Sequence, residues 1–238
     1  MTTTGPTRSG WVGRLFFGPW WLVYAGVVAP TERHRHHAVQ IVLAPGASVV
    51  DDTGQRPSPT VIAPDLPHAL AGGGTGTVVF IDPEATTTPR LLADPTSLAT
   101  LGLTNELPAT MTDAEELIGS LTHTGDETRP GHHPAIAAVL GMLPDGPDAP
   151  LAALASQAGI SASRLTHLFT QDLGIPLRAY RRWVRFMLAA DALQNGATLT
   201  QAAHRAGFAD VAHLHRTFRD QFGLRPGRLL RAVEWVTT

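Results

Sequence analysis

The chain has 238 residues, which is enough for two domains that each bury a hydrophobic core. It contains no cysteine, and this excludes disulfides, zinc–cysteine sites and thiol catalysis. Its 18 basic residues are all arginine, and they are unevenly placed: residues 1–131 hold 7 arginines against 13 acidic residues, whereas residues 132–238 hold 11 against 7. Such a charge asymmetry predicts that the C-terminal part contacts nucleic acid.

The N-terminal part consists of short apolar runs separated by turn residues. The run from Leu15 to Ala29 resembles the apolar segment of a signal peptide, but it is too short to span a bilayer and Gly18-Pro19 interrupts it. Two buried strands are therefore expected there. Further strands are expected at 38–43, 60–63 and 77–81. Together these runs predict a small antiparallel β-sandwich or barrel over residues 1–90.

The next segment, residues 91–131, is expected to be a helical linker that also takes part in dimerisation. Helices are expected near 95–102 and 112–123. The spacing of Thr112 and Glu115 predicts a capping box at the start of the second helix. One side of this helix carries Leu117, Ile118 and Leu121. This apolar side is a candidate dimer contact, and internal packing is the alternative.

The C-terminal part, residues 132–238, carries one pattern twice, with its two glycines 48 residues apart. In each copy a small residue, Ala155 or Ala203, lets two helices approach closely, and a glycine, Gly159 or Gly207, ends the first helix with a positive φ. The pattern predicts two helix-turn-helix units. They are expected at about 151–173 and 199–222.

Residues 177–194 lie between the two units, and their apolar residues recur at three- and four-residue spacing, which predicts a helix. Arginines fill its other face. Such a helix is roughly 26 Å long. It would hold the two units at a fixed separation, as binding to successive turns of DNA, about 34 Å apart, requires.

The C-terminal part resembles the DNA-binding domain of the AraC/XylS family of bacterial transcription regulators. The motifs that carry the resemblance are Gly207-Phe208, Leu214-x-Arg216-x-Phe218 and Gly223-Leu224-Arg225-Pro226, together with the paired units and their joining helix. The similarity covers about residues 135–232, and it departs from the family where Gly-x-Ser-Pro is usual in the tail. The resemblance implies an α+β fold of two domains: a small cupin-like β-barrel that senses a ligand, with a helical dimerisation segment, and an all-α domain with tandem helix-turn-helix units.

The same resemblance implies a sequence-specific, effector-responsive transcription regulator whose two recognition helices enter successive major grooves. The expected partners are double-stranded operator or promoter DNA, a small-molecule effector, RNA polymerase and a second copy of the chain. No enzyme activity, cofactor or membrane is expected, and the location expected is the cytoplasm. The alternatives are a cupin metal-dependent enzyme fused to a DNA-binding module, and an architectural DNA binder without an effector.

The resemblance and the helical faces also select the residues expected to contact DNA. They are Ser163, Arg164, Thr166 and His167 on the first recognition helix, Arg182 on the joining helix, and Val211, Ala212, His213 and Arg216 on the second recognition helix. Arg216 is suited to a bidentate contact with guanine, and a phosphate contact or an internal salt bridge is the alternative. Further arginines expected near phosphates are Arg181, Arg205, Arg219 and Arg228.

A group of histidines stands out in the N-terminal part. In an extended strand His34, His36 and Gln40 would share one face, with His37 on the other, and His68 follows a later strand. The spacing resembles the metal-binding pattern of cupins, with Gln40 in place of the carboxylate ligand. A metal site, a polar pocket for an effector and structurally packed histidines all remain open. The glutamine favours the effector pocket, so a bound metal is not expected.

Overall fold

The computed structural model describes residues 10–84, 98, 106–122 and 131–236. Contacts divide the chain into two compact units. One comprises Met1–Gly125 with Phe218–Thr238, and the other comprises Asp126–Thr217. This division differs from the boundary expected at residue 132, because the final residues of the chain group with the N-terminal unit. The expected domain boundaries therefore remain predictions.

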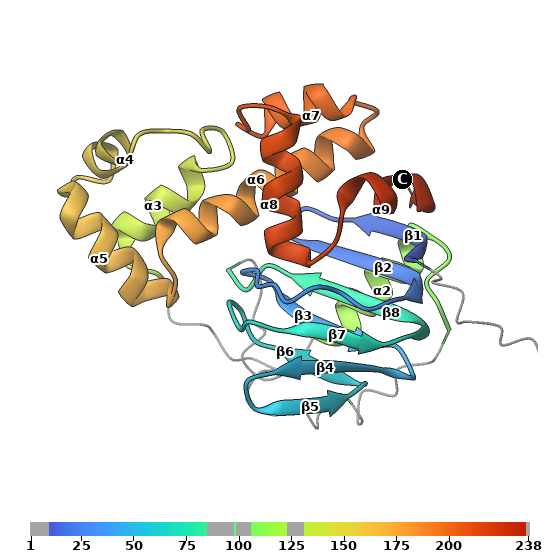
Figure 1. Ribbon diagram of the computed structural model, residues 1–238. Coiled ribbons are helices and arrows are strands. Elements are labelled where there is room, and N and C mark those ends of the chain that lie inside the picture. Colours follow the sequence, from blue (N-terminus) through green and yellow to red (C-terminus); the bar gives the residue numbers. More distant parts are fainter. Residues whose placement is uncertain (1–9, 85–97, 99–105, 123–130, 237–238) are drawn as a thin grey trace, which may run out of the picture. The chain divides into compact units, whose positions relative to one another are not determined.

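The first unit contains two β-sheets (Figure 1). The strands are β1 (Val12–Phe17), β2 (Trp21–Val28), β3 (Val39–Leu43), β4 (Ala47–Asp51), β5 (Gly54–Pro57), β6 (Thr60–Ile62), β7 (Ala69–Gly72), β8 (Gly74–Ile81) and β9 (Val233–Val236). The larger sheet has the order β6-β3-β8-β2-β1-β9, and the smaller has the order β5-β4-β7. The pairs are antiparallel except for β1 with β9, which is parallel. The two strands expected within Leu15–Ala29 are confirmed as β1 and β2.

The larger sheet is buried on both faces, which explains why β2 is apolar along its whole length. Alternate residues such as Val23 and Ile41 form a core with helix α2 (Met111–Thr122). Residues between them, such as Tyr24 and Val42, are buried as well. On the face opposite α2, the Nε2 atom of His68, which precedes β7 of the smaller sheet, lies 2.9 Å from the Oε1 atom of Gln40 in β3. The polar side chains of Gln40 and His68 are therefore buried between the two sheets.

Helix α2 uses its apolar side internally. Ile118 and Leu121 are 3% and 1% exposed and pack against the larger sheet, so internal packing, and not the candidate dimer contact, describes these residues. The capping box also lies two residues earlier than expected. The Thr110 hydroxyl accepts a hydrogen bond from the Asp113 amide at 3.2 Å, and the Asp113 carboxylate accepts one from the Thr110 amide at 2.9 Å. The helix expected near 95–102 lies outside the described residues apart from Leu98.

The C-terminal part is not entirely helical. After α9 (Pro226–Ala232), strand β9 pairs in parallel with β1 at the edge of the larger sheet. The rings of Trp235 and Phe17 stack with their centroids 5.2 Å apart. The partner strand of β9 lies more than 200 residues away in the sequence, so local periodicity does not reveal the pairing.

The remaining helices form the two expected helix-turn-helix units and their connection. They are α3 (Pro134–Met142), α4 (Leu151–Gln157), α5 (Ala162–Leu173), α6 (Leu177–Gln194), α7 (Leu199–Arg205) and α8 (Val211–Phe222). The joining helix α6 has the bounds expected from the sequence. Within the described residues, no helix is long and apolar enough to cross a membrane. The two-part architecture, mostly β and then helical, is confirmed.

Candidate nucleic-acid interface and histidine cluster

The first helix-turn-helix unit consists of α4 and α5. Gly159 takes a φ of +70° in the turn, and the Ile160 amide donates a hydrogen bond to the Ala155 carbonyl at 3.0 Å. The expected N-cap, Ser161, accepts a hydrogen bond from the Arg164 amide at 3.2 Å. The residues that fix α5 in the core are Leu165, Leu168 and Phe169. Sequence reasoning predicted each of these contributions because all of them depend on local spacing.

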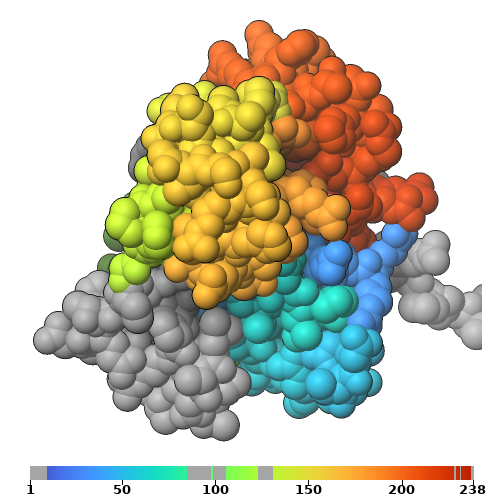
Figure 2. Space-filling view, turned by 90° about the vertical axis from the view of Figure 1, so that its left-hand side faces the viewer, coloured from blue at the N-terminus to red at the C-terminus, as the bar shows by residue number. Residues whose placement is uncertain are grey.

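The opposite side of α5 is polar and exposed. Ser163, Arg164, Thr166 and His167 are all exposed, as expected for residues that contact DNA. In Figure 2 the yellow to orange atoms of α4 and α5 lie at the surface that faces the viewer. Within the part of the chain that the structure describes, no residue pairs with the Arg164 guanidinium or the His167 ring. Both groups are therefore available to a ligand.

The second unit consists of α7 and α8, with Gly207 at a φ of +73° between them. Two of the four candidates on α8 are partly used internally. Val211 packs beside the small core that contains Leu214, and the His213 ring stands edge-on to Phe208 at 5.3 Å. The other two, Ala212 and Arg216, are exposed.

Arg216 has no hydrogen bond or ion pair with any other described residue. Its exposed side chain on α8 therefore does not form the internal salt bridge that the sequence had left open, at least within the described ranges. A contact with DNA, either to a base or to a phosphate, is the interpretation that remains.

The arginines of α6 have different surroundings. The Arg181 guanidinium donates to the carbonyl of Ala149, and burial lowers its pKa. The Arg185 guanidinium forms an ion pair with Asp148. Arg182 is half-buried and has no partner among the residues the structure describes. Thus Arg182 remains a candidate for phosphate contact, whereas Arg181 has an internal role that its sequence position does not indicate.

Two further arginines expected near phosphates belong to the compact unit that contains the β-sheets. Arg219, at the end of α8, forms an ion pair with Glu32, with the Nη2 and Oε2 atoms 2.8 Å apart. The side chain of Arg228 lies outside the described residues. Arg205, by contrast, belongs to the helical compact unit, Asp126–Thr217, and is exposed on α7.

Four polar side chains meet in the interior of the compact unit that contains the β-sheets: His34, His36, His68 and Gln40. We refer to them as the histidine cluster. All four are buried, with exposures between 0% and 6%. The Gln40 Oε1 atom lies 2.8 Å from His36 Nε2 and 2.9 Å from His68 Nε2. His34 and His68 form an isolated β-bridge, with their rings 4.2 Å apart. The grouping expected from the sequence is present, although only Gln40 of its first three members lies in a regular strand, because β3 begins at Val39.

Each imidazole of the histidine cluster is held by a backbone carbonyl. The Nδ1 atoms of His34, His36 and His68 lie 2.8, 3.1 and 2.8 Å from the carbonyl oxygens of Glu32, Ala38 and Leu66, respectively. A carbonyl only accepts hydrogen bonds, so each Nδ1 carries the proton. In a neutral ring the lone pair is then on Nε2.

Burial keeps these rings neutral. It lowers the pKa of His34 from its usual value of 6.5 to about 3, and it lowers the pKa of His36 and His68 as well. The neighbouring imidazoles add to the effect for His34 and His36, because two positive charges at this distance repel each other. At neutral pH the cluster therefore presents three uncharged imidazoles.

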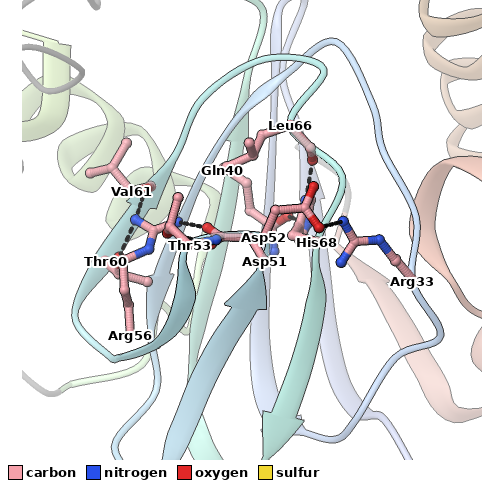
Figure 3. A network of polar contacts seen from close by, with 10 residues as sticks. All are labelled: Arg33, Gln40, Asp51, Asp52, Thr53, Arg56, Thr60, Val61, Leu66 and His68. Atoms are coloured by element: carbon pink, nitrogen blue, oxygen red, sulfur yellow. Dashed lines mark hydrogen bonds and ion pairs between the residues drawn. The ribbon is translucent and has the colours of Figure 1, made fainter.

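A network of charged residues lies next to His68 (Figure 3). Arg56 of β5 pairs with the buried Asp51 carboxylate of β4 at 2.6 Å and also donates to the Val61 carbonyl at 3.0 Å. Arg33 pairs with Asp52 at 2.7 Å. The Arg33–Asp52 pair ties the β4–β5 turn to the segment that carries His34, whereas the Arg56–Asp51 pair lies within the smaller sheet. Sequence reasoning did not single out either pair.

His37 points away from this group, as expected. Its Nε2 atom lies 3.6 Å from a carboxylate oxygen of Glu84, and both side chains are buried.

The end of α8 packs against the histidine cluster. The Phe222 ring stacks on His36 with their centroids 5.9 Å apart and meets Phe80 at 5.5 Å. The Gly223 carbonyl accepts a hydrogen bond from the Glu32 amide at 3.0 Å. These contacts all lie within the compact unit that contains the β-sheets, and they place the last turn of α8 beside the histidine cluster. Sequence reasoning did not single out Glu32 or Phe222.

The comparisons with known proteins agree with this geometry. The family described as "Helix-turn-helix domain" matches residues 154–232. The chain is 27% identical over 108 residues to the HTH-type transcriptional regulator NimR of Escherichia coli (strain K12), an alignment that covers 44% of this chain and 39% of that protein. It is 39% identical over 69 residues to the uncharacterized HTH-type transcriptional regulator YpdC of the same strain, covering 29% of this chain and 24% of that protein. The chain thus spans less than half the length of these relatives.

A solved structure shares the fold over most of the chain. It is ToxT from Vibrio cholerae O395 bound to (E)-4-(8-methylnaphthalen-1-yl)but-3-enoic acid, with a TM-score of 0.53 and 11% identity, and the match covers 90% of this chain and 99% of that chain. At this identity the likeness shows the fold. The matched domain and the paired units show that residues 154–232 form a helix-turn-helix domain similar in sequence to those of the transcriptional regulators NimR and YpdC.

Proposed function

We propose that the protein is a sequence-specific DNA-binding transcription regulator whose β-sheet unit senses a small ligand at the histidine cluster. The observation that carries the DNA-binding part is the polar side of α5. It is exposed, and its arginine and imidazole groups are unpaired within the described residues. Such a side on the second helix of a helix-turn-helix unit suits the major groove.

The two recognition helices have different chemistry. On α5, Ser163, Thr166 and His167 offer short hydrogen-bonding groups. On α8, Ala212 suits a thymine methyl group and Arg216 suits guanine. The second helix should therefore contribute more of the discrimination between bases, and Arg164 and Arg182 should contribute affinity through phosphates.

Ligand sensing is supported by the buried polar atoms of the histidine cluster and by the fold shared with ToxT, whose structure holds an organic acid. A ligand changes DNA affinity only if it favours one state of the protein over another. The last turn of α8 packs on the cluster, so a ligand there would act on a recognition helix directly. A homodimer and a contact with RNA polymerase fit this function and remain predictions.

Selection from a random pool of duplexes with the full chain, followed by fluorescence anisotropy, tests the proposal. We expect the selected duplex to bind at least about a thousandfold more tightly than a scrambled duplex at physiological salt. An Arg164→Ala variant should weaken binding to both duplexes by a similar factor and reduce the salt dependence. Equal affinity of the unchanged chain for selected and scrambled duplexes would contradict sequence-specific binding.

A further inference from the structure

We propose that the histidine cluster binds one divalent transition-metal ion through Nε2 of His34, His36 and His68 and through Oε1 of Gln40. This inference deepens the proposed function, on which it rests for its biological meaning, because the ion would be the ligand that the sheet unit senses. It departs from the expectation drawn from the sequence, where the glutamine favoured an organic effector.

The ligand atoms of the cluster converge on one place. One ligand atom from each of the three histidines lies within 4.8 Å of the others. Metal–nitrogen bonds of about 2.1 Å place neighbouring ligands of one ion roughly 3.0–3.4 Å apart. The Gln40 Oε1 atom already lies 2.8 and 2.9 Å from two of the ring nitrogens. Small rotations of buried rings would therefore complete a coordination sphere.

The orientation of the rings also suits a metal ion. All three Nδ1 atoms face backbone carbonyls, so all three Nε2 atoms carry their lone pairs. A histidine that ligates a metal is commonly fixed in this way, with its second nitrogen donating to a carbonyl or carboxylate. Three rings held in the same tautomer by three different carbonyls form a prepared set of ligands.

Gln40 places a third hydrogen-bond acceptor beside two ring nitrogens that are also acceptors. Its Oε1 atom faces the Nε2 atoms of His36 and His68, and both of these atoms are acceptors in the neutral rings. Acceptors at hydrogen-bond distance repel each other unless a cation lies among them or the amide is turned around. A turned amide offers one N–H group to each of these two ring nitrogens, whereas one cation would bind all four atoms of the proposed ligand set, including His34 Nε2.

The ligand set also indicates the class of ion. Imidazole nitrogens suit zinc, cobalt, nickel, copper and ferrous iron, whereas magnesium and calcium prefer oxygen ligands. No carboxylate belongs to the cluster, so the four ligands are neutral and the bound ion keeps its charge. Binding should be weaker than at a site with a glutamate, and such reversibility suits a sensor.

Titration of Co²⁺ into the chelator-treated full chain tests the proposal, because bound Co²⁺ absorbs visible light. We expect one equivalent to bind and one equivalent of Zn²⁺ to displace it. Gln40→Glu, which keeps the size of the side chain, should tighten Co²⁺ binding about tenfold or more by adding a negative charge to the ligand set. His68→Ala should weaken it at least about tenfold, while His204→Ala, on the exposed surface of α7, should leave it unchanged.

The outcomes separate the metal from the DNA-binding function. No Co²⁺ absorption and no stoichiometric Zn²⁺ in either the unchanged chain or the folded Gln40→Glu variant would overturn the metal site. Binding that persists unchanged in His68→Ala would overturn it as well. Duplex binding measured on the same preparations addresses the proposed function alone: a protein that binds DNA without binding metal refutes only the metal, and one that binds metal without binding DNA refutes only the regulator.

Discussion

Replacing Arg216 tests whether the second recognition helix reads bases. The side chain is exposed and has no partner within the described ranges, so Arg216→Ala should change the free energy of unfolding by less than about 0.5 kcal/mol. A bidentate contact with guanine is worth about 1–3 kcal/mol against a wrong base. Because about 1.4 kcal/mol is a factor of ten, binding to the selected duplex should weaken roughly 5- to 150-fold.

The assay is fluorescence anisotropy with the selected and the scrambled duplex at several salt concentrations. Arg216→Lys is the matched control, because it keeps the charge and loses the planar fork that guanine requires. If Arg216 reads a base, both variants lose most of the discrimination between the two duplexes. Equal weakening on both duplexes by the alanine variant, with recovery in the lysine variant, would refute base reading and make Arg216 a phosphate contact.

Three further changes probe the fold around the two sites, each measured by urea unfolding. Gly207→Ala and Gly159→Ala should each lower the free energy of unfolding by about 1 kcal/mol, because both glycines have a positive φ. Gly207→Ala should lower it further, because its new methyl group would meet the carboxylate of Asp148; equal losses in the two variants would exclude that contact. Phe222→Ala should lower the free energy of unfolding by about 3–5 kcal/mol, because the side chain of Phe222 is buried. Arg219→Ala should lower it by less than about 1 kcal/mol, because the ion pair of Arg219 is exposed; a larger loss in Arg219→Ala than in Phe222→Ala would show that charge holds the end of α8. Lowering the pH of the chelator-treated chain from 7 to 5.5 should lower its free energy of unfolding by at least about 1 kcal/mol. Burial lowers the pKa of His34 to about 3, so this ring stays neutral in the folded chain over that range, whereas in the unfolded chain its pKa is 6.5 and it takes up a proton; the lowered pKa values of His36 and His68 act in the same direction. A free energy of unfolding that does not change over this range would contradict neutral burial.

The helical part of the fold could be predicted closely because its signals are local. The three- and four-residue spacing over Leu177–Gln194 gives the bounds of α6, and the glycine of each turn takes the positive φ that its position demands. The short strands β4, β5 and β7 were missed, because four or five residues are too few for alternation to be recognised, and β5 is also mostly polar. Strand β9 was missed because its extended conformation depends on pairing with β1, which lies at the other end of the sequence.

The candidate sites show the same limit. The expected alternation grouped His34, His36 and Gln40, and the motif added His68, although only Gln40 of the first three lies in a strand; the tautomers depend on carbonyls that only the fold supplies. The roles of the arginines could not be separated from the sequence. Arg181 and Arg182 are adjacent, yet only Arg181 meets a carbonyl from another segment.

The sequence did not decide what covers the apolar side of α2. Its leucine and isoleucine were equally suited to a partner molecule and to the sheet, and burial against the sheet decides for the second. An apolar stripe shows that a helix is covered, but it does not show what covers it.

Two recognition helices of one chain should read two successive major grooves, and the proposed function depends on this arrangement. Methylation interference on the selected duplex tests it most directly, because the modified N7 atom of guanine lies in the major groove. We expect two groups of interfering guanines on one face of the duplex, about one helical turn or 10 base pairs apart. In Arg216→Ala the group read by α8 should disappear, while the group read by α5 should remain. A single group in the unchanged chain, or none at salt concentrations where it binds the duplex, would contradict the arrangement.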